Sequence, residues 1–84
     1  MSKTSYYIYM VLCSDDTFYT GITTDLTRRI EEHNSSPKGA KYTKARRPVS
    51  LVYSEEHLDR SSASKRECQI KKMSRKEKKI LINI

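Results

Sequence analysis

The sequence has few apolar residues and no long run of them. Hydrophobic residues make up 36% of the 84 residues, tryptophan is absent and phenylalanine occurs once. No stretch approaches the roughly 20 apolar residues that a membrane-spanning helix needs, so we expect no membrane partner. No repeat or linker divides the chain. We therefore expect a single domain over residues 1–84, with its core at about 5–80 and a size near the lower limit for unassisted folding.

Cysteine is also scarce. The two cysteines, Cys13 and Cys68, do not have the spacing of metal ligands. The pair would allow one disulfide, but two free thiols in a reducing cytosol are the simpler interpretation. The first residues lead directly into a patterned segment, without the features of a signal peptide. We therefore expect a cytoplasmic protein.

Positive charge, in contrast, is abundant and lies in two blocks. Residues 35–50 hold five Lys or Arg and no acidic residue, and residues 59–84 hold nine against three. Residues 1–34 hold three Lys or Arg against five Asp or Glu, and the formal net charge of the chain is +7. Clustered cations favour a polyanionic partner, because each phosphate contact releases condensed counterions. A solvated, solubilising surface is the alternative. The sequence thus favours nucleic acid as a partner and indicates no obligate protein partner.

The N-terminal part has the pattern of a β-hairpin. Residues 5–13 and 17–23 are aromatic and β-branched, and residues 14–16 supply turn chemistry between them. Both alternating faces of the first run are apolar. This predicts a strand that is covered on both sides.

The rest of the chain predicts mainly helices around one more strand. We expect first a helix that is capped by Thr24 or Asp25 and ends near Asn34. A basic loop over 35–47 follows, with one helical turn and with breakers at Pro37 and Gly39, and it leads into a strand over 49–53. Asp59 or Ser61 then opens a second long helix, and Ser74 caps a short last helix that places Ile80 and Leu81 in the core. The order ββαβαα predicts an α+β fold, in which helices flank a small three-stranded, largely antiparallel sheet.

Two polar residues of the first predicted helix lie at its apolar face. At about 100° per residue, Leu26, Ile30 and His33 share that face. Arg29 borders the same face, whereas Arg28 points to water. A guanidinium at such a border needs an anionic partner.

Structural interpretations exist for both polar residues. Arg29 can extend to the helix edge or pair with Glu32 or Glu56. His33 can be a satisfied, partly buried residue or a functional group. The helix pattern alone leaves these alternatives open.

The second long helix carries one carboxylate beside its inward stripe. Glu67 lies close to the face that holds Ala63 and Ile70. It can complete a capping box with Ser64 or pair with Lys71 one turn away. It can also hold a metal ion, since Mg²⁺ is often bound by one or two carboxylates together with phosphate and water.

Six of the seven aromatic residues are tyrosines, and two of them flank the predicted turn. Tyr9 and Tyr19 emerge on the same sheet face if the register sum of the hairpin is even. Tyrosine is also simply a good strand residue with a polar end. The strand pattern leaves both interpretations open.

Taken together, these positions resemble the GIY-YIG nuclease domain. The family has a strand ending Gly-Ile-Tyr, a second Tyr-Ile-Gly element, a helix with an Arg and a later helix with a Glu. Here these elements read Tyr7-Ile8-Tyr9, Tyr19-Thr20-Gly21, Arg29 and Glu67. The resemblance covers residues 6 to about 80.

The similarity is greatest to small stand-alone bacterial members of the family. The stretches Gly39-Ala-Lys-Tyr-Thr43 and Arg47-Pro-Val-Ser-Leu-Val-Tyr53 look typical of that group. Two positions depart from the pattern, because Tyr7 replaces the first glycine and Thr20 replaces an aliphatic residue. A further polar residue that follows the Glu in some relatives has no clear equivalent here.

The resemblance implies a site and its chemistry. Glu67 would hold a single Mg²⁺ or Mn²⁺, and Arg29 would stabilise charge on the phosphorane. Tyr9 would act as general base, with Tyr19 orienting water or phosphate and His33 as a proton relay. Contacts to the nucleic-acid backbone are expected from six basic residues: Lys38, Lys41, Arg46, Arg47, Lys71 and Lys72.

The implied function is a metal-dependent endonuclease that hydrolyses phosphodiester bonds. DNA is favoured over RNA as the substrate. A domain this small is expected to cleave in a structure-selective or non-specific way, and to act in DNA repair or recombination. The main alternative is a non-catalytic module that binds DNA or RNA with the same basic face. A third interpretation is a small interaction protein that docks through residues 80–84.

Overall fold

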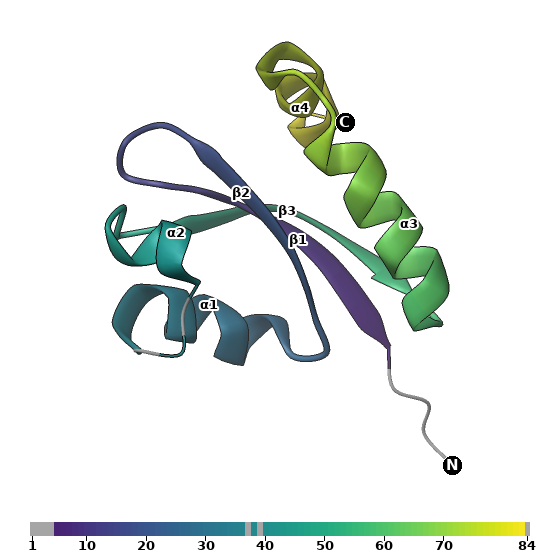
Figure 1. Cartoon of the computed structure of the whole chain (residues 1–84), viewed down its shortest axis with the longest axis horizontal. Coiled ribbons are helices and arrows are strands. Elements are labelled where there is room, and N and C mark those ends of the chain that lie inside the picture. The colour runs from purple at the N-terminus through teal and green to yellow at the C-terminus, as the bar shows by residue number, and fades with distance from the viewer. Residues whose placement is uncertain (1–4, 37, 39, 84) are drawn as a thin grey trace.

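A three-stranded antiparallel sheet separates two layers of helices in the computed structural model, which describes residues 5–36, 38 and 40–83 (Figure 1). The elements follow in the order β1 Tyr6–Leu12, β2 Phe18–Thr23, α1 Leu26–Ser35, α2 Lys41–Lys44, β3 Ser50–His57, α3 Arg60–Lys71 and α4 Arg75–Ile82. The predicted α+β fold is confirmed, and the expected helical turn in the basic loop is α2. The predicted breakers Pro37 and Gly39, and Ile84, lie outside the described residues.

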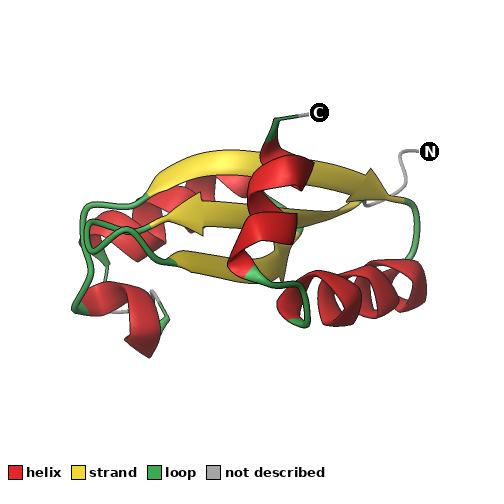
Figure 2. Ribbon diagram, turned by 90° about the horizontal axis from the view of Figure 1, so that it is seen from above, coloured by secondary structure: helices red, strands yellow, loops and turns green. Residues whose placement is uncertain are grey.

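The first strand is the centre of the sheet, whose order is β2-β1-β3. Its central position explains why both faces of this strand are apolar, since helices cover each side (Figure 2). In the hairpin, Tyr9 is opposite Gly21 and Val11 is opposite Tyr19. Opposed residues point to the same face. Tyr9 and Tyr19 therefore share a face, as an even register requires.

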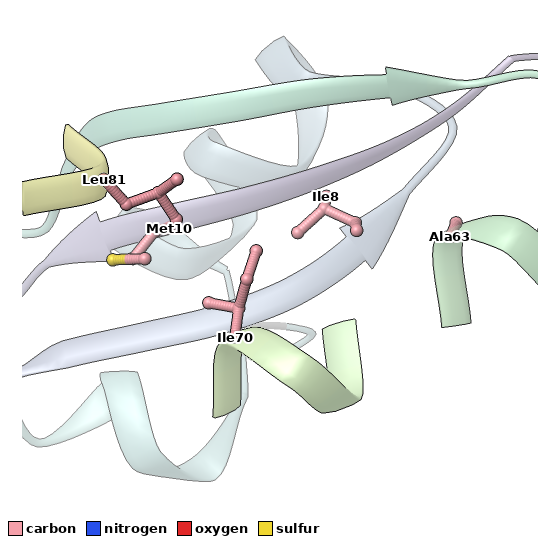
Figure 3. Packing of buried hydrophobic residues seen from close by; sticks show 5 residues of the cluster. All are labelled: Ile8, Met10, Ala63, Ile70 and Leu81. Carbon is pink, nitrogen blue, oxygen red and sulfur yellow. The ribbon is translucent and has the colours of Figure 1, made fainter. Parts of the chain in front are cut away.

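One face of the sheet packs against the C-terminal helices. Ile8 and Met10 of β1 meet Ala63 and Ile70 of α3 and Leu81 of α4, and all five are buried (Figure 3). These contacts hold α3 against β1 and β2. The helix that carries Glu67 is thereby fixed relative to the hairpin.

The expectation that Ile80 joins this core is wrong. Leu81 is 8% exposed, but the neighbouring Ile80 is 59% exposed. Adjacent residues of a helix point about 100° apart. Because α4 is short and lies on the surface, only one of the two can face the sheet.

The opposite face of the sheet holds the second cluster. Tyr9, Val11 and Cys13 of the β1 segment pack with Val49, and α1 covers them with Leu26 and Ile30. Tyr19 packs against the same group. This is the face on which the candidate site forms.

Side chains set the helix boundaries much as the sequence indicated. Asp25 caps α1 and Asp59 caps α3, each accepting a backbone N–H three residues on. Ser74 and Glu77 form a capping box at α4. The proposed box between Ser64 and Glu67 does not form, because α3 already begins at Arg60.

The third strand is longer than predicted. It runs to His57, not to Tyr53. Glu55 fits within the strand because Arg66 of α3 and His57 donate hydrogen bonds to its carboxylate. Burial alone would raise the pKa of Glu55, but the bonds from Arg66, Tyr53 and His57 outweigh it and lower that pKa to about 2. Arg66, a partner from another element, thus helps to stabilise a charge that the local pattern assigns to a loop.

Both thiols are free, with Cys13 buried and Cys68 exposed, so the disulfide alternative does not apply. Among the described residues, no helix is long and apolar enough to cross a membrane.

Candidate active site

Tyr9 lies at the centre of the site, and Gly21 makes room for it. The two residues are opposite each other in the hairpin, and Tyr9 is only 1% exposed. A Cβ at position 21 would lie 2.6 Å from Cζ of the tyrosine and still closer to its hydroxyl. The ring therefore occupies the space that any side chain at residue 21 would need. Glycine is required here by close approach, not by backbone conformation.

The Tyr9 hydroxyl is joined to His33 of α1. Its oxygen lies 2.7 Å from His33 Nε2, and His33 Nδ1 lies 2.8 Å from Thr43 Oγ1. The Thr43 hydroxyl donates its proton to the Ala40 carbonyl at 2.9 Å, because a carbonyl can only accept. Thr43 must then accept from Nδ1–H. Neutral His33 consequently has a bare Nε2, which accepts the proton of the Tyr9 hydroxyl.

Burial shapes the titration of both partners. Burial raises the pKa of Tyr9 to about 12, although the adjacent Arg29 guanidinium opposes the rise. Burial, with the charge of Arg29 acting in the same direction, lowers the pKa of His33 to about 4. The phenol is therefore protonated and the imidazole neutral near pH 7. A neutral acceptor faces a phenolic donor.

Arg29 takes the position that the helix pattern predicts. It is half-buried at the edge of α1, whereas Arg28 is exposed. Its guanidinium donates to Glu32 and to the Lys38 carbonyl, both at 2.9 Å. Of the two proposed partners Glu32 is the one used, and Glu56 instead accepts from Ser5. Because the guanidinium also affects the Tyr9 pKa, one cation is held next to the phenol.

Tyr19 is the more accessible of the two strand tyrosines. It is half-buried, and its ring centroid is 6.4 Å from that of Tyr9 and 5.3 Å from that of His33. Tyr42 of α2 stacks on its outer side, with centroids 5.9 Å apart. Tyr19 therefore connects the buried pair with the surface.

Glu67 lies on α3, which packs on the other face of the sheet. Its carboxylate forms the predicted pair with Lys71 at 3.3 Å and is 22% exposed. Its negative charge contributes to the raised pKa of Tyr9, so the two groups are within electrostatic range. Among the described residues, no group of three or more His, Cys, Asp or Glu could hold a metal ion. A single carboxylate such as that of Glu67 would suit only a cation, such as Mg²⁺, that can complete its shell with water and phosphate.

The six expected backbone contacts divide into two kinds. Four are exposed lysines, of which Lys71 is paired with Glu67: Lys38, Lys41, Lys71 and Lys72. The two arginines are already engaged. Arg46 pairs with Asp15 at 2.9 Å, and Arg47 donates to three carbonyls at the end of α1. Arg47 therefore helps to hold α1, the helix that carries His33, in place.

Two residues near the site were not identified from the sequence. Thr43 is fully buried and sets the His33 tautomer, and Tyr42 extends the aromatic cluster. Neither breaks a periodic pattern, because both lie in the basic loop. The only signal was the stretch Gly39-Ala-Lys-Tyr-Thr43, which looked typical of a family group.

A phenol, a neutral imidazole and a guanidinium gathered on one sheet face, within range of a helix-borne carboxylate, indicate a domain of the endonuclease type. The family model described as the GIY-YIG catalytic domain matches residues 5–80, and the chain belongs to that family. Nucleases of the family generally use a divalent metal.

Relatives and solved structures agree with this assignment. The chain is 56% identical over 80 residues to the UPF0213 protein DP2720 of Desulfotalea psychrophila, covering 95% of this chain and 73% of that protein. It is 56% identical over 82 residues to a UPF0213 protein of Syntrophus aciditrophicus, covering 98% and 92%. The solution structure of the UPF0213 protein BH0048 from Bacillus halodurans has 40% identity and a TM-score of 0.61, covering 94% and 83%. The solution structure of EF2693 from E. faecalis has 47% identity and a TM-score of 0.63, covering 92% of this chain and 81% of that one.

Proposed function

We propose that this protein is a metal-dependent endonuclease that hydrolyses phosphodiester bonds of nucleic acid, with DNA preferred to RNA. The observation that supports this most directly is the hydrogen-bond chain from Tyr9 through His33 to Thr43. The chain gives the Tyr9 phenol a defined proton acceptor, and the charges of Arg29 and Glu67 both affect the pKa of this phenol. We also propose a cytoplasmic location, on the two free thiols.

Glu67 is the residue that would hold the metal. When bound, Mg²⁺ or Mn²⁺ would polarise a phosphate oxygen and stabilise the leaving 3′ oxygen. Lys71 is exposed and only one helical turn away, so it can release the carboxylate and turn to a phosphate.

The proton path uses the residues of the sheet face. A water that attacks phosphorus gives its proton to Tyr9 Oη, while Tyr9 passes its own proton to His33 Nε2. With the pKa of Tyr9 at about 12, free phenolate is scarce near pH 7, and the coupled transfer does not require it. The negative phosphate nearby favours the imidazolium that results.

Arg29 and Tyr19 would act on the phosphate. Nη1 of Arg29 donates to both Glu32 and the Lys38 carbonyl, so the guanidinium is held in place before substrate binds, and its other nitrogens remain for a phosphate. An oriented cation of this kind stabilises charge that develops in the transition state. Tyr19, the half-buried phenol, would orient the water or the phosphate.

Cleavage of plasmid and branched DNA in Mg²⁺, Mn²⁺ or EDTA tests the proposal. Glu67→Ala should abolish metal-dependent nicking while the protein keeps its fold, and Glu31→Ala, an exposed carboxylate on α1, should cleave normally. Equal activity of Glu67→Ala and wild type would refute the assignment. A wild type that binds DNA without any metal-dependent product would establish the non-catalytic binding module instead.

The two arginines of α1 give a second matched comparison. Arg29→Ala should lower kcat by about 10²–10³-fold, the usual cost of removing an oriented oxyanion partner. Arg28→Ala, one residue away and exposed, should change it little. Equal losses would overturn the placement of Arg29 at the reacting phosphate.

The choice of base is tested at the two phenols. Tyr9→Phe should lower kcat by about 10²–10⁴-fold, as expected for loss of general-base catalysis, and Tyr19→Phe by less. A larger loss in Tyr19→Phe would make the more accessible phenol the base and Tyr9 a positioning residue.

A further inference from the structure

An ordered stack of planar groups runs from the candidate active site to the surface. Tyr42 lies nearly parallel to Tyr19, with an angle of 25° between the rings. The Arg46 guanidinium carbon lies 3.9 Å from the centre of the same Tyr42 ring. Tyr19 in turn meets His33 edge-on. Tyr19, Tyr42 and Arg46 therefore form a continuous series of planar groups between the candidate site and the surface.

The Arg46 guanidinium, at the end of this series, is held in a fixed orientation. Arg46 Nε donates to Asp15 and Nη1 donates to the Tyr42 carbonyl, both at 2.9 Å. These two bonds set the plane of the guanidinium above the ring. The Arg46 side chain is 34% exposed and Tyr42 is 37% exposed, so neither is sealed from solvent.

This arrangement suits stacking better than contact with a phosphate. Nε and Nη1 of Arg46 are already in use, by Asp15 and by the Tyr42 carbonyl. The flat surface, however, remains. Nucleobases stack on tyrosine rings and on guanidinium planes regardless of their identity.

We propose that Tyr42 and Arg46 form a stacking platform for one unpaired nucleobase of the strand whose phosphate lies at Tyr9 and Tyr19. A base within a duplex already stacks on both neighbours, so only an unpaired base can use the platform. The preferred substrate class is then single-stranded or locally unpaired nucleic acid. The inference rests on the proposed function, since it assigns a substrate to the same site.

Fluorescence of 2-aminopurine in an oligonucleotide tests the platform, because stacking quenches it. Binding is measured in EDTA, where no cleavage occurs, with a single strand and with the same strand in a duplex. The wild type should quench the single strand and bind it more tightly than the duplex. Matched DNA and RNA strands show which sugar the site accepts.

Four variants separate stacking from charge and from folding. Tyr42→Phe keeps the ring and should keep quenching, whereas Tyr42→Leu should lose quenching and weaken single-strand binding by about 5–150-fold, the range for one stacked base. Arg46→Lys keeps the charge beside Asp15 but loses the plane, and it should weaken binding in the same direction. Lys44→Ala removes an exposed charge of the same helical turn and should leave quenching unchanged. Thermal unfolding checks that each variant is folded.

Two results would overturn the platform. One is equal affinity of the wild type for single strand and duplex. The other is quenching in Tyr42→Leu and Arg46→Lys that matches Lys44→Ala. Failure of the wild type to cleave in Mg²⁺ would instead refute the proposed nuclease, while the quenching data would still decide on the platform.

Discussion

At the scale of single residues, His33 has the most restricted environment of the site. It is fully buried, and both ring nitrogens have partners from different elements, Tyr9 on β1 and Thr43 on α2. Burying an imidazolium there would cost desolvation free energy and add a positive charge beside Arg29. The folded protein therefore keeps His33 neutral over a wide pH range.

This neutrality predicts a pH-dependent stability. Between pH 6.5 and about 4, His33 binds a proton in the unfolded chain but not in the folded one, so acidification favours unfolding. The free energy of unfolding should fall by up to about 3 kcal/mol across this window, on top of other groups. Urea unfolding of wild type and His33→Gln from pH 7 to 4 isolates the contribution. Parallel profiles for the two proteins would disprove it. The ¹⁵N shifts of the imidazole report the Nδ1–H tautomer and its titration directly.

Gly21 gives a second prediction at this scale. In Gly21→Ala the new methyl group must displace the Tyr9 ring, which overpacks the strand and breaks the bond to His33. We expect a loss of about 1–3 kcal/mol in the free energy of unfolding and a changed His33 Nε2 resonance. In a Tyr9→Leu background the same change should cost much less. A cycle of the four proteins measures this coupling, and strictly additive costs would contradict the contact.

At the scale of elements, α1 is held by polar groups to the segment that leads into β3. The Asn34 amide bonds both the N–H and the C=O of Val49, and Arg47 donates to the carbonyls of Glu32, His33 and Ser36. The bonds from Arg47 give donors to carbonyls at the C-terminal end of α1, where a helix leaves carbonyls without intrahelical partners. They also fix the helix that carries Arg29 and His33. Arg47 thus serves the site through the position of α1.

The second strand contains one unsatisfied hydroxyl. Thr20 is 4% exposed on the face toward α3, and its Oγ1 has no hydrogen-bond partner among the described residues. Replacing an unpaired buried hydroxyl by a methyl group removes its desolvation cost. Thr20→Val should therefore raise the free energy of unfolding by about 1 kcal/mol. Thr23→Val is the matched control and should lower it, because Thr23 Oγ1 accepts the Asp25 N–H. Chemical unfolding of both variants measures these changes. Destabilisation by Thr20→Val would contradict an unpaired Thr20 hydroxyl.

Element boundaries show where local patterns suffice. Asp25, Asp59 and Ser74 each cap a helix because cap chemistry acts within three residues. The end of β3 was missed because Glu55 depends on Arg66, eleven residues away on another element. Charged residues in an edge strand look like a loop until their partners are known.

At the scale of the whole molecule, the basic residues are unevenly engaged. The arginines Arg46, Arg66 and Arg75 pair with acidic residues, whereas exposed lysines dominate the free positive charge among the described residues. Arg75 also joins α4 to the hairpin turn through Asp16. Arginine thus mainly stabilises the fold, and apart from the proposed role of Arg29, lysines would supply the contacts to phosphates.

Salt dependence tests this division. Each phosphate contact to a single strand contributes about 0.7 to the slope of log affinity against log salt. The double variant Lys38→Ala/Lys41→Ala should reduce that slope by about 1.4, while Lys76→Ala/Lys79→Ala on α4, with the same loss of net charge, should change it little. Fluorescence anisotropy between about 50 and 200 mM salt measures both. Equal slopes would show that net charge, and not position, governs binding.

The amino-acid sequence by itself determined the two strands of the hairpin, the cap of α4 and which arginine of α1 borders the buried face. These follow from hydrophobic period and from chemistry within one turn. Only the tertiary structure decided that His33 is neutral with a bare Nε2, because its partners lie 24 and 10 residues away along the chain. It also decided that Arg47 binds carbonyls and that Tyr42 completes a stack. The protonation and hydrogen bonding of a polar side chain depend on which groups surround it in space, and a linear pattern does not contain that information.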